Sequence, residues 1–129
     1  MAIQIPCNFD EPIHHLIHKV VTSEKWQIVF KQQRNYVMGT VEDYFNVISA
    51  LSDEFDIWTT TYHHVLPSHE ALWAWYEGTG LRPYLSQIDD SMKDEFKKDI
   101  MEEIRVNYPL QKNNKVIFDF PRLFFVVEK

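Results

Sequence analysis

Three segments with strand character, separated by helical segments, limit this chain to an α/β arrangement with a thin sheet. The segments are Ala2–Ile5, Phe55–Tyr62 and Val116–Val127, and all are rich in β-branched, apolar or aromatic residues. Strands alternating with amphipathic helices are typical of α/β proteins. Pro121 predicts an interruption or bulge in the last strand, because proline cannot donate to a sheet ladder. A sheet of three strands is also expected to keep one bare edge.

The first two helices are predicted from their starts. Pro12 follows Glu11 and stands where proline is tolerated, at the first helical position. Thr40 and Asp43 resemble a capping box, with aspartate where glutamate is usual. The polar segment Trp26–Met38 is predicted to be a loop with some helix. Apolar residues at helical spacing follow each start: Ile13, Leu16, Ile17, Val20 and Val21 in the first helix, and Val41, Tyr44, Phe45, Ile48 and Leu51 in the second.

Two further helices are predicted before Pro109. Ser68 is a good N-cap, and Gly78 is placed as the left-handed stop of the same helix. Ser91–Asp94 resembles the start of a longer helix, and Pro109 ends it. Four apolar residues lie four apart along this longer helix: Phe96, Ile100, Ile104 and Tyr108.

Composition narrows the function classes. The 129 residues correspond to one domain, and 45% of them are hydrophobic, which is ample for a core. The net charge of −6 argues against a nucleic-acid partner, because binding phosphates needs a basic surface. No apolar stretch approaches the ~18 residues of a membrane span, and no secretory signal is recognised. The single cysteine, Cys7, excludes an intrachain disulfide and fits a reducing compartment, so we expect a cytoplasmic protein.

Four stretches resemble the second half of the trans-aconitate 2-methyltransferase family, which belongs to the S-adenosylmethionine-dependent class I methyltransferases. They are Ala2–Pro12 with His14, Phe55–His69, Gly78–Leu85 and Tyr108–Val127. The runs Asp-Ile-Trp-x-Thr-Thr-Tyr-x-His and Gly-Thr-Gly-Leu-Arg-Pro are the most specific of these. The resemblance implies methyl transfer to a carboxylate of a small polycarboxylic acid, trans-aconitate in that family.

The resemblance also implies a Rossmann-like fold with strand order 3-2-1-4-5-7-6. In that fold Ala2–Pro6 would be strand five, Phe55–Tyr62 strand six and Val116–Val127 strand seven, antiparallel between the other two. Residues 68–109 would form a helical insertion that covers the substrate side of the active site. Residues 1–129 would then be a single, partial methyltransferase domain without its N-terminal, cofactor-binding half.

Cofactor binding in such enzymes depends on a glycine-rich turn after a strand. This chain has only Gly39, Gly78 and Gly80, and the latter two follow a predicted helix. We therefore expect that S-adenosylmethionine, the cofactor of the intact family, is not bound by this chain alone. No catalytic residue is predicted, and the cofactor-binding residues are left unassigned.

Substrate binding is assigned to four residues: Tyr62, His64, Arg82 and Asn8. On the resemblance, Tyr62 and His64 would donate hydrogen bonds to the acid at the end of a strand. Arg82 could clamp a carboxylate with two bonds, and Asn8 could donate to one. Each has a structural alternative: packed rings for Tyr62 and His64, a helix-capping arginine for Arg82, and a turn asparagine for Asn8.

Four further residues are assigned no role in catalysis or ligand binding: Arg122, His14, His18 and Cys7. Arg122 lies among apolar residues, which favours a structural salt bridge. His14 and His18 are four apart on a helix, as zinc ligands can be, but no third ligand is evident, so no metal site is predicted. Nothing near Cys7 in sequence would lower its pKa, so a catalytic role is not predicted.

A second interpretation, from a different class, stays open. The chain could be a non-catalytic binding or oligomerisation module derived from a methyltransferase. Its bare edge, Ala2–Ile5, would pair with a second copy or with a separate N-terminal half. On that ground we expect a homodimer or larger assembly, with no membrane partner.

Overall fold

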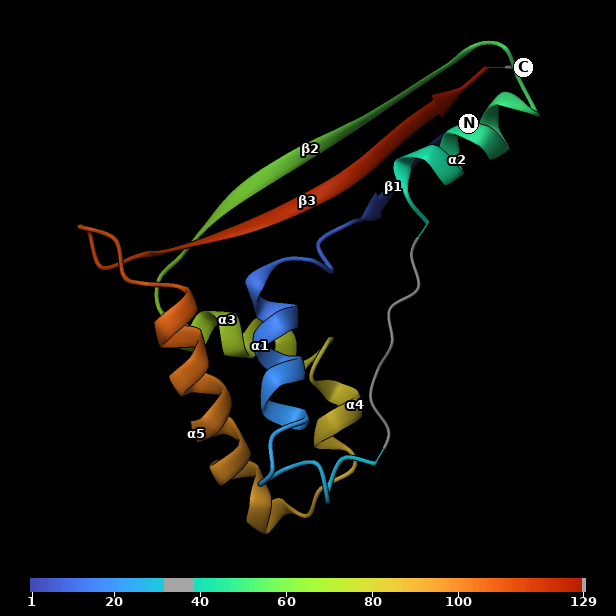
Figure 1. Cartoon of the computed structure of the whole chain (residues 1–129). Coiled ribbons are helices and arrows are strands. Elements are labelled where there is room, and N and C mark those ends of the chain that lie inside the picture. The colour runs from blue at the N-terminus through green and yellow to red at the C-terminus, as the bar shows by residue number, and fades with distance from the viewer. Residues whose placement is uncertain (32–38, 129) are drawn as a thin grey trace. The chain divides into compact units, whose positions relative to one another are not determined.

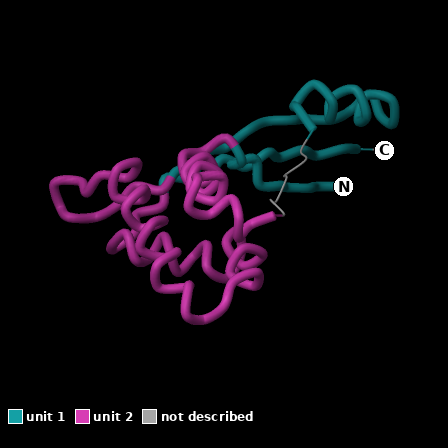
Figure 2. Tube along the Cα trace, turned by 60° about the horizontal axis from the view of Figure 1, so that its bottom comes forward, with its two compact units in different colours: residues 1–9, 36–63, 119–129 teal, residues 10–35, 64–118 magenta. Residues whose placement is uncertain are grey.

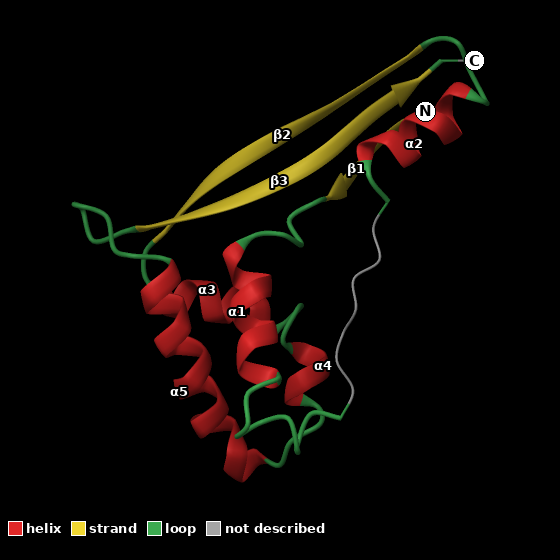
Figure 3. Cartoon of the chain, in the orientation of Figure 1, coloured by secondary structure: helices red, strands yellow, loops and turns green. Residues whose placement is uncertain are grey.

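The computed structural model describes residues 1–31 and 39–128, which form strands and helices in the predicted alternation (Figures 1 and 3). The predicted α/β class is therefore confirmed. The predicted loop of residues 26–38 is described only to Lys31, and its remainder lies outside the described residues. In chain order the elements are β1 (Ala2–Pro6), α1 (Pro12–Val21), α2 (Val41–Ser49), β2 (Phe55–Leu66), α3 (His69–Glu77), α4 (Arg82–Leu85), α5 (Asp90–Asn107) and β3 (Val116–Val127).

The sheet has the order β1-β3-β2, so the last strand lies in the middle. β1 pairs antiparallel with β3, from Ala2 opposite Val126 to Pro6 opposite Arg122. β2 is antiparallel to β3 as well, because contacts that advance along β2 recede along β3. Trp58 stacks on Phe124, whereas His63 meets Asp119.

Pro121 lies within a continuous β3, so the predicted interruption or bulge is wrong. The amide of Cys7 donates to the Pro121 carbonyl (3.0 Å), just past the end of β1. The backbone of Pro121 therefore faces Cys7, which lies beyond the end of β1. The N–H that proline lacks is not needed there to continue the pairing of β1 with β3.

Three other predictions of element ends are corrected. β2 runs four residues further than predicted, to Leu66, because β3 extends far enough to pair with it. Gly78 is the C-cap of α3 but has φ −84° and ψ −7°, so it is not a left-handed stop. The long helix α5 begins after Asp89, so Ser91 lies inside it and is not its cap.

The chain clusters into two compact units (Figure 2). The sheet unit comprises residues 1–9, 36–63 and 119–129, and the helical unit comprises residues 10–35 and 64–118. The ends of β2 and β3, from His64 onward and up to Phe118, belong to the helical unit.

In the sheet unit, α2 begins with the predicted capping box. The Thr40 hydroxyl accepts from the Asp43 amide (3.1 Å), and the Asp43 carboxylate accepts from the Thr40 amide (2.9 Å). The apolar face behind it is mostly exposed, contrary to a core-facing role: of this helix only Ile48 is buried. Its rings still contact the strands, since Tyr44 stacks near Phe125 and Phe45 meets Phe55 edge to face.

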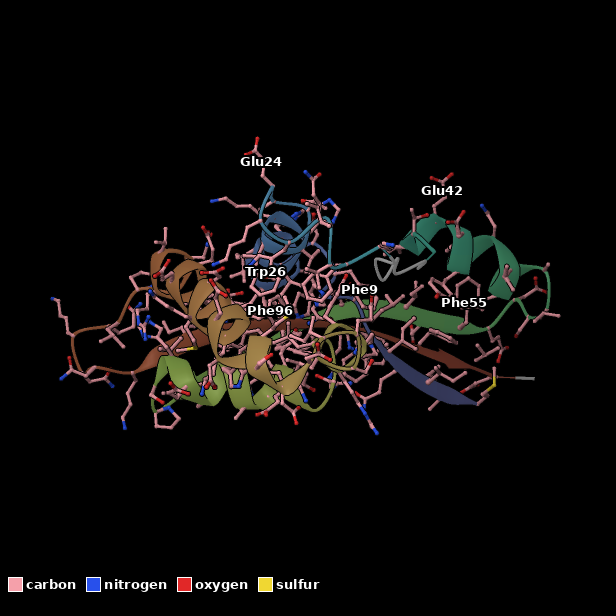
Figure 4. The ribbon with its side chains drawn as sticks, turned by 90° about the horizontal axis from the view of Figure 1, so that it is seen from below. Phe9, Glu24, Trp26, Glu42, Phe55 and Phe96 are labelled. Carbon is pink, nitrogen blue, oxygen red and sulfur yellow. The ribbon has the colours of Figure 1, made fainter. Side chains whose placement is uncertain are left out.

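In the helical unit, α5 packs against α1 and supplies the core face that its spacing predicted. Phe96, Ile100 and Ile104 are fully buried, and Tyr108 nearly so. Trp26 and Phe30, which follow α1, pack on Phe96 with ring centroids 5.2 and 5.0 Å away. Trp26 and Phe96 are labelled in Figure 4.

Asp99 of α5 anchors the turn that carries Trp26. One carboxylate oxygen accepts from the indole Nε1 (2.7 Å) and from Lys25 Nζ (2.9 Å). Desolvation raises the pKa of Asp99, but the hydrogen bonds from Lys25 and Trp26 outweigh it, and the net pKa is lowered. The folded state therefore favours the carboxylate, and Asp99 stabilises the fold only while it is ionised.

Asp99→Asn is expected to lower the free energy of unfolding by about 1 kcal/mol near pH 7, because charged acceptors bond more strongly than neutral ones. A lowered folded-state pKa gives stability that is present above the unfolded value, 3.8, and is lost as pH falls through the folded value. The deficit of the variant should thus be full above about pH 5, shrink as pH falls below 3.8, and vanish only below the lower folded-state pKa. Urea denaturation between pH 3 and 7 measures it.

Glu102→Gln is the matched control, because Glu102 lies on the same helix and is exposed. It should leave the pH dependence unchanged. An Asp99→Asn protein with the same loss of stability between pH 5 and 3 as the wild type would contradict the assignment.

Candidate functional site

The four predicted substrate-binding residues fall in different units. Asn8 and Tyr62 belong to the sheet unit, and His64 and Arg82 to the helical unit. The structure therefore tests the surroundings of each residue within its own unit.

Tyr62 and His63 lie on β2 with much of their surface exposed. Tyr62 is 41% exposed. The ring of His63 is hydrogen-bonded through Nδ1 to the Asp119 carboxylate on the neighbouring strand. His63 thus has a cross-strand partner within the sheet unit, which fits a structural contribution.

His64 is half-buried in a group of rings in the helical unit. Its ring centroid lies 5.2 Å from that of Trp75 on α3 and 6.4 Å from that of Phe118 on β3. Phe118 is fully buried and also contacts Trp75 (5.1 Å) and Tyr76 (5.9 Å). Stacking fixes the plane of the imidazole and directs its nitrogens, a condition for recognising an acid.

A second histidine joins this group from a distant part of the sequence. His14 Nε2 lies 3.3 Å from the Tyr76 hydroxyl, and the two rings meet edge to face at 5.5 Å. We name the set His14, His64, Trp75, Tyr76 and Phe118 the aromatic–histidine cluster. His14 was weighed only as a metal ligand in the sequence; its place in the Glu-Pro-x-His match was the signal that could have found it.

Tyr108, which contacts Phe118 of the cluster, forms two hydrogen bonds with residues outside the cluster. His69 Nε2 donates to the Tyr108 carbonyl (2.6 Å), and the Tyr108 hydroxyl accepts from the Ile13 amide (3.0 Å). The second bond satisfies an amide in the first turn of α1, which helix geometry leaves without an internal partner. Tyr108 also contacts Phe118 (6.2 Å), so it ties α1 and α5 to the ring group.

Arg82 is exposed at the first position of α4. Its amide donates to Thr79, but no described residue forms a hydrogen bond or ion pair with its guanidinium. The alternative role, capping the carbonyls of the preceding helix, therefore finds no support among the described residues. A guanidinium in this state can receive a carboxylate from solution.

Asn8 is buried, with 3% of its surface exposed, directly after β1. No buried side-chain nitrogen or oxygen in the described part of the chain lacks a hydrogen-bond partner, so the Asn8 amide is already satisfied. This environment is that of an asparagine that stabilises a turn.

Arg122 has a ring, not a carboxylate, as its partner. Its guanidinium carbon lies 4.7 Å from the centroid of the Phe120 ring. The predicted structural salt bridge is therefore wrong for the described residues, and a cation–π contact takes its place. Within residues 1–31 and 39–128, no three His, Cys, Asp or Glu side chains are grouped to hold a metal ion.

Gly39 and Gly78 do not form the glycine-rich turn that holds S-adenosylmethionine in class I methyltransferases. Gly39 immediately precedes the capping box, and Gly78 ends a helix, so neither makes a tight turn after a strand. A Cβ placed on Gly78 would meet nothing within 4 Å, so no close approach requires glycine there. Neither of these two glycines therefore supplies the turn on which cofactor binding in such enzymes depends.

None of the described helices is long and apolar enough to cross a membrane.

The whole chain is similar to half of a known enzyme. All 129 residues align at 36% identity with trans-aconitate 2-methyltransferase of Escherichia coli O139:H28, and at 35% with the protein of that name from Escherichia fergusonii. Each match covers 100% of this chain and 50% of the relative. The chain thus spans about half the length of these curated relatives, consistent with a C-terminal half of that family, and the resemblance predicted from the sequence is confirmed. No protein-family model matches the chain.

Proposed function

We propose that this chain, similar throughout to half of trans-aconitate 2-methyltransferase, is the C-terminal, substrate-side half of such an enzyme. The reaction would transfer a methyl group from S-adenosylmethionine to a carboxylate of a small polycarboxylic acid in the cytoplasm. The alignment of all 129 residues at 36% identity, over half the relative's length, carries this proposal. Because the other half is not encoded in these residues, the chain alone would be inactive.

The sheet supports the proposed correspondence of strands. In the class I fold that the resemblance implies, the last strand lies antiparallel between strands five and six. The order β1-β3-β2, with β3 antiparallel to β1, has this form. Residues 68–109, which contain α3, α4 and α5, would then be the insertion on the substrate side.

Polycarboxylate binding is proposed for Arg82 and His64 within the helical unit. For Tyr62 and Asn8, which belong to the sheet unit, substrate binding stays a prediction from the resemblance alone. Three observations support the proposal for the helical unit. The guanidinium of Arg82 is exposed, His64 packs against the rings of Trp75 and Phe118, and the hydroxyl of Tyr76 is paired with His14. Donors of this kind position a carboxylate without removing a proton.

Completion of the enzyme would come through the edge of β1. This strand pairs only with β3, and its other side is an edge of the sheet. A separate N-terminal half, carrying the glycine-rich turn, would add its strand there.

A second candidate is a non-catalytic binding or oligomerisation module. The observation that favours it is that neither Gly39 nor Gly78 forms a tight turn after a strand. The two functions differ in whether the acid binds.

Calorimetric titration of the chain with trans-aconitate, and separately with S-adenosylmethionine, distinguishes them. We expect binding of the acid and none of the cofactor. Arg82→Ala should weaken binding of the acid by about tenfold, since a bidentate charged contact is lost. Arg105→Ala is the matched control, because Arg105 is also an exposed helical arginine. The Arg105→Ala variant should bind the acid with the affinity of the unmodified chain.

Loss of acid binding to an equal extent in both arginine variants would show a general charge effect, against the proposed site. If the acid does not bind to the unmodified chain, the non-catalytic module is favoured. Cofactor binding by the chain alone would overturn the proposed division into halves.

A further inference from the structure

The edge of β2 is built without the usual protection against pairing. β2 is twelve residues long and lies at the opposite edge of the sheet from β1. Natural edge strands carry lysine, proline or a bulge that prevents association. The segment Phe-Asp-Ile-Trp-Thr-Thr-Thr-Tyr-His-His-Val-Leu has no lysine and no proline. β2 and β3 also keep the same register along their length, so neither strand contains an inserted residue that would form a bulge. Three contacts show this register: Glu54 with Glu128, Trp58 with Phe124, and His63 with Asp119.

Alternation along the strand shows which backbone groups point outward. The Glu54 carbonyl accepts from the Glu128 amide (2.9 Å), so the backbone of residue 54 faces β3. Even-numbered residues of β2 then bond to β3, and odd-numbered residues direct N–H and C=O away from the sheet. Among the described residues, β2 has a strand on one side only, and no backbone bond from a turn, loop or cap reaches Ile57, Thr59 or Thr61.

We propose that this edge pairs antiparallel with β2 of a second copy of the chain, about a two-fold axis at Thr60. In this register the outward groups of Thr59 bond those of Thr61 in the second copy, and Ile57 bonds His63. The even-numbered residues become the closer, non-hydrogen-bonded pairs, in which side chains meet directly.

The side chains complement one another in this register. Trp58, 44% exposed, lies opposite Tyr62, 41% exposed, and the pair occurs twice by symmetry. Asp56, exposed, lies opposite His64, also twice. A shift by two residues in either direction would oppose Trp58 to Thr60 or His64, and Asp56 to Tyr62 or Leu66. Both shifts lose the acid–histidine and the aromatic pairs.

We propose a second copy of the chain as the partner because the side chains of β2 complement those of an identical strand. The aromatic row also continues inside each copy, where Trp58 stacks on Phe124 with an angle of 6° between the rings. Pairing at β2 leaves the edge of β1 open, but it engages His64, which the proposed function assigns to the acid, and Tyr62, for which the resemblance predicts the same role. Sedimentation of the chain without the acid therefore tests the pairing separately from the proposed function.

The test uses the position on the axis. Thr60→Lys places two lysines opposite each other only in the paired state, and Thr60→Glu places two glutamates there. Sedimentation velocity across the micromolar range should show a dimer for the wild type and at least about tenfold weaker association for each variant. A mixture of the two variants should restore the dimer, because lysine then faces glutamate.

Thr59→Lys with Thr59→Glu is the matched control. Thr59 faces Thr61 of the second copy and not itself, so mixing these variants should restore little. A wild-type chain that sediments as a monomer overturns the proposal, and so does unchanged association of both Thr60 variants. If a variant fails to fold, hydrogen exchange of the wild type decides: the amides of Thr59 and Thr61 should become protected as concentration rises, and unchanged exchange overturns the pairing.

Discussion

Replacing Phe118 by alanine is expected to lower the free energy of unfolding by about 3–5 kcal/mol. The ring is fully buried and touches Trp75, Tyr76 and Tyr108 at centroid distances of 5.1, 5.9 and 6.2 Å. Its removal leaves a cavity that the neighbouring rigid rings cannot fill by small movements. The loss of van der Waals contacts around this cavity adds to the free energy lost because less apolar surface is buried.

Tryptophan fluorescence during urea denaturation can follow this unit separately. In a Trp58→Phe background, the remaining tryptophans are Trp26, Trp73 and Trp75, all in the helical unit. Ile117→Ala is the control, because residue 117 precedes Phe118 on the same strand and its side chain is 43% exposed. It should cost less than about 1 kcal/mol. Equal losses at the two positions would mean that Phe118 is not central to the core.

The same replacement should also disturb the proposed acid site. Without Phe118, the rings of His64 and Trp75 lose a shared neighbour, and the imidazole is no longer fixed in one plane. Phe118→Leu retains most of the volume and should lose less stability, which separates packing from ring orientation.

Phe96→Ala is the second replacement with a large expected effect, again about 3–5 kcal/mol. Phe96 is fully buried on α5 and contacts Trp26 and Phe30, whose turn has no regular helix or strand to hold it. The turn therefore depends on this ring and on the bond from Trp26 to Asp99. Denaturation in the Trp58→Phe background measures the loss, and Trp26 reports it directly.

Phe45→Ala is the matched control, because Phe45 lies on a helix but is 47% exposed. Its loss should be about 1 kcal/mol or less, from the single ring contact with Phe55. A Phe96→Ala protein as stable as Phe45→Ala would show that the turn after α1 is not packed on α5.

Helix starts and core faces were predicted where the signal is local. The capping box of Thr40 and Asp43 formed as expected, since its atoms lie within one turn. The four residues spaced along α5 are buried, because a helix brings every fourth residue to one face. The face of α2 was predicted by the same rule, but the sequence does not state whether another element covers a face. Most of it is exposed.

The candidate site was predicted only in part for a similar reason. His64 and Arg82 were found through motifs within one stretch, whereas His14 and Tyr76 are 62 residues apart and meet only in the folded chain. The environment of Arg122 was misjudged because its neighbour in space is the ring of Phe120. No spacing rule distinguishes a carboxylate partner from a ring.

By itself, the sequence determined the alternation of strands and helices, the apolar face of α5 and the likeness to half of a methyltransferase. These follow from contacts within a few residues or from matched stretches in order. Only the tertiary structure decided that β3 continues through Pro121, that β2 reaches Leu66, and that His14 joins Tyr76. Each depends on what lies across a strand or helix, and that is decided by where chain segments far apart in sequence come to pack.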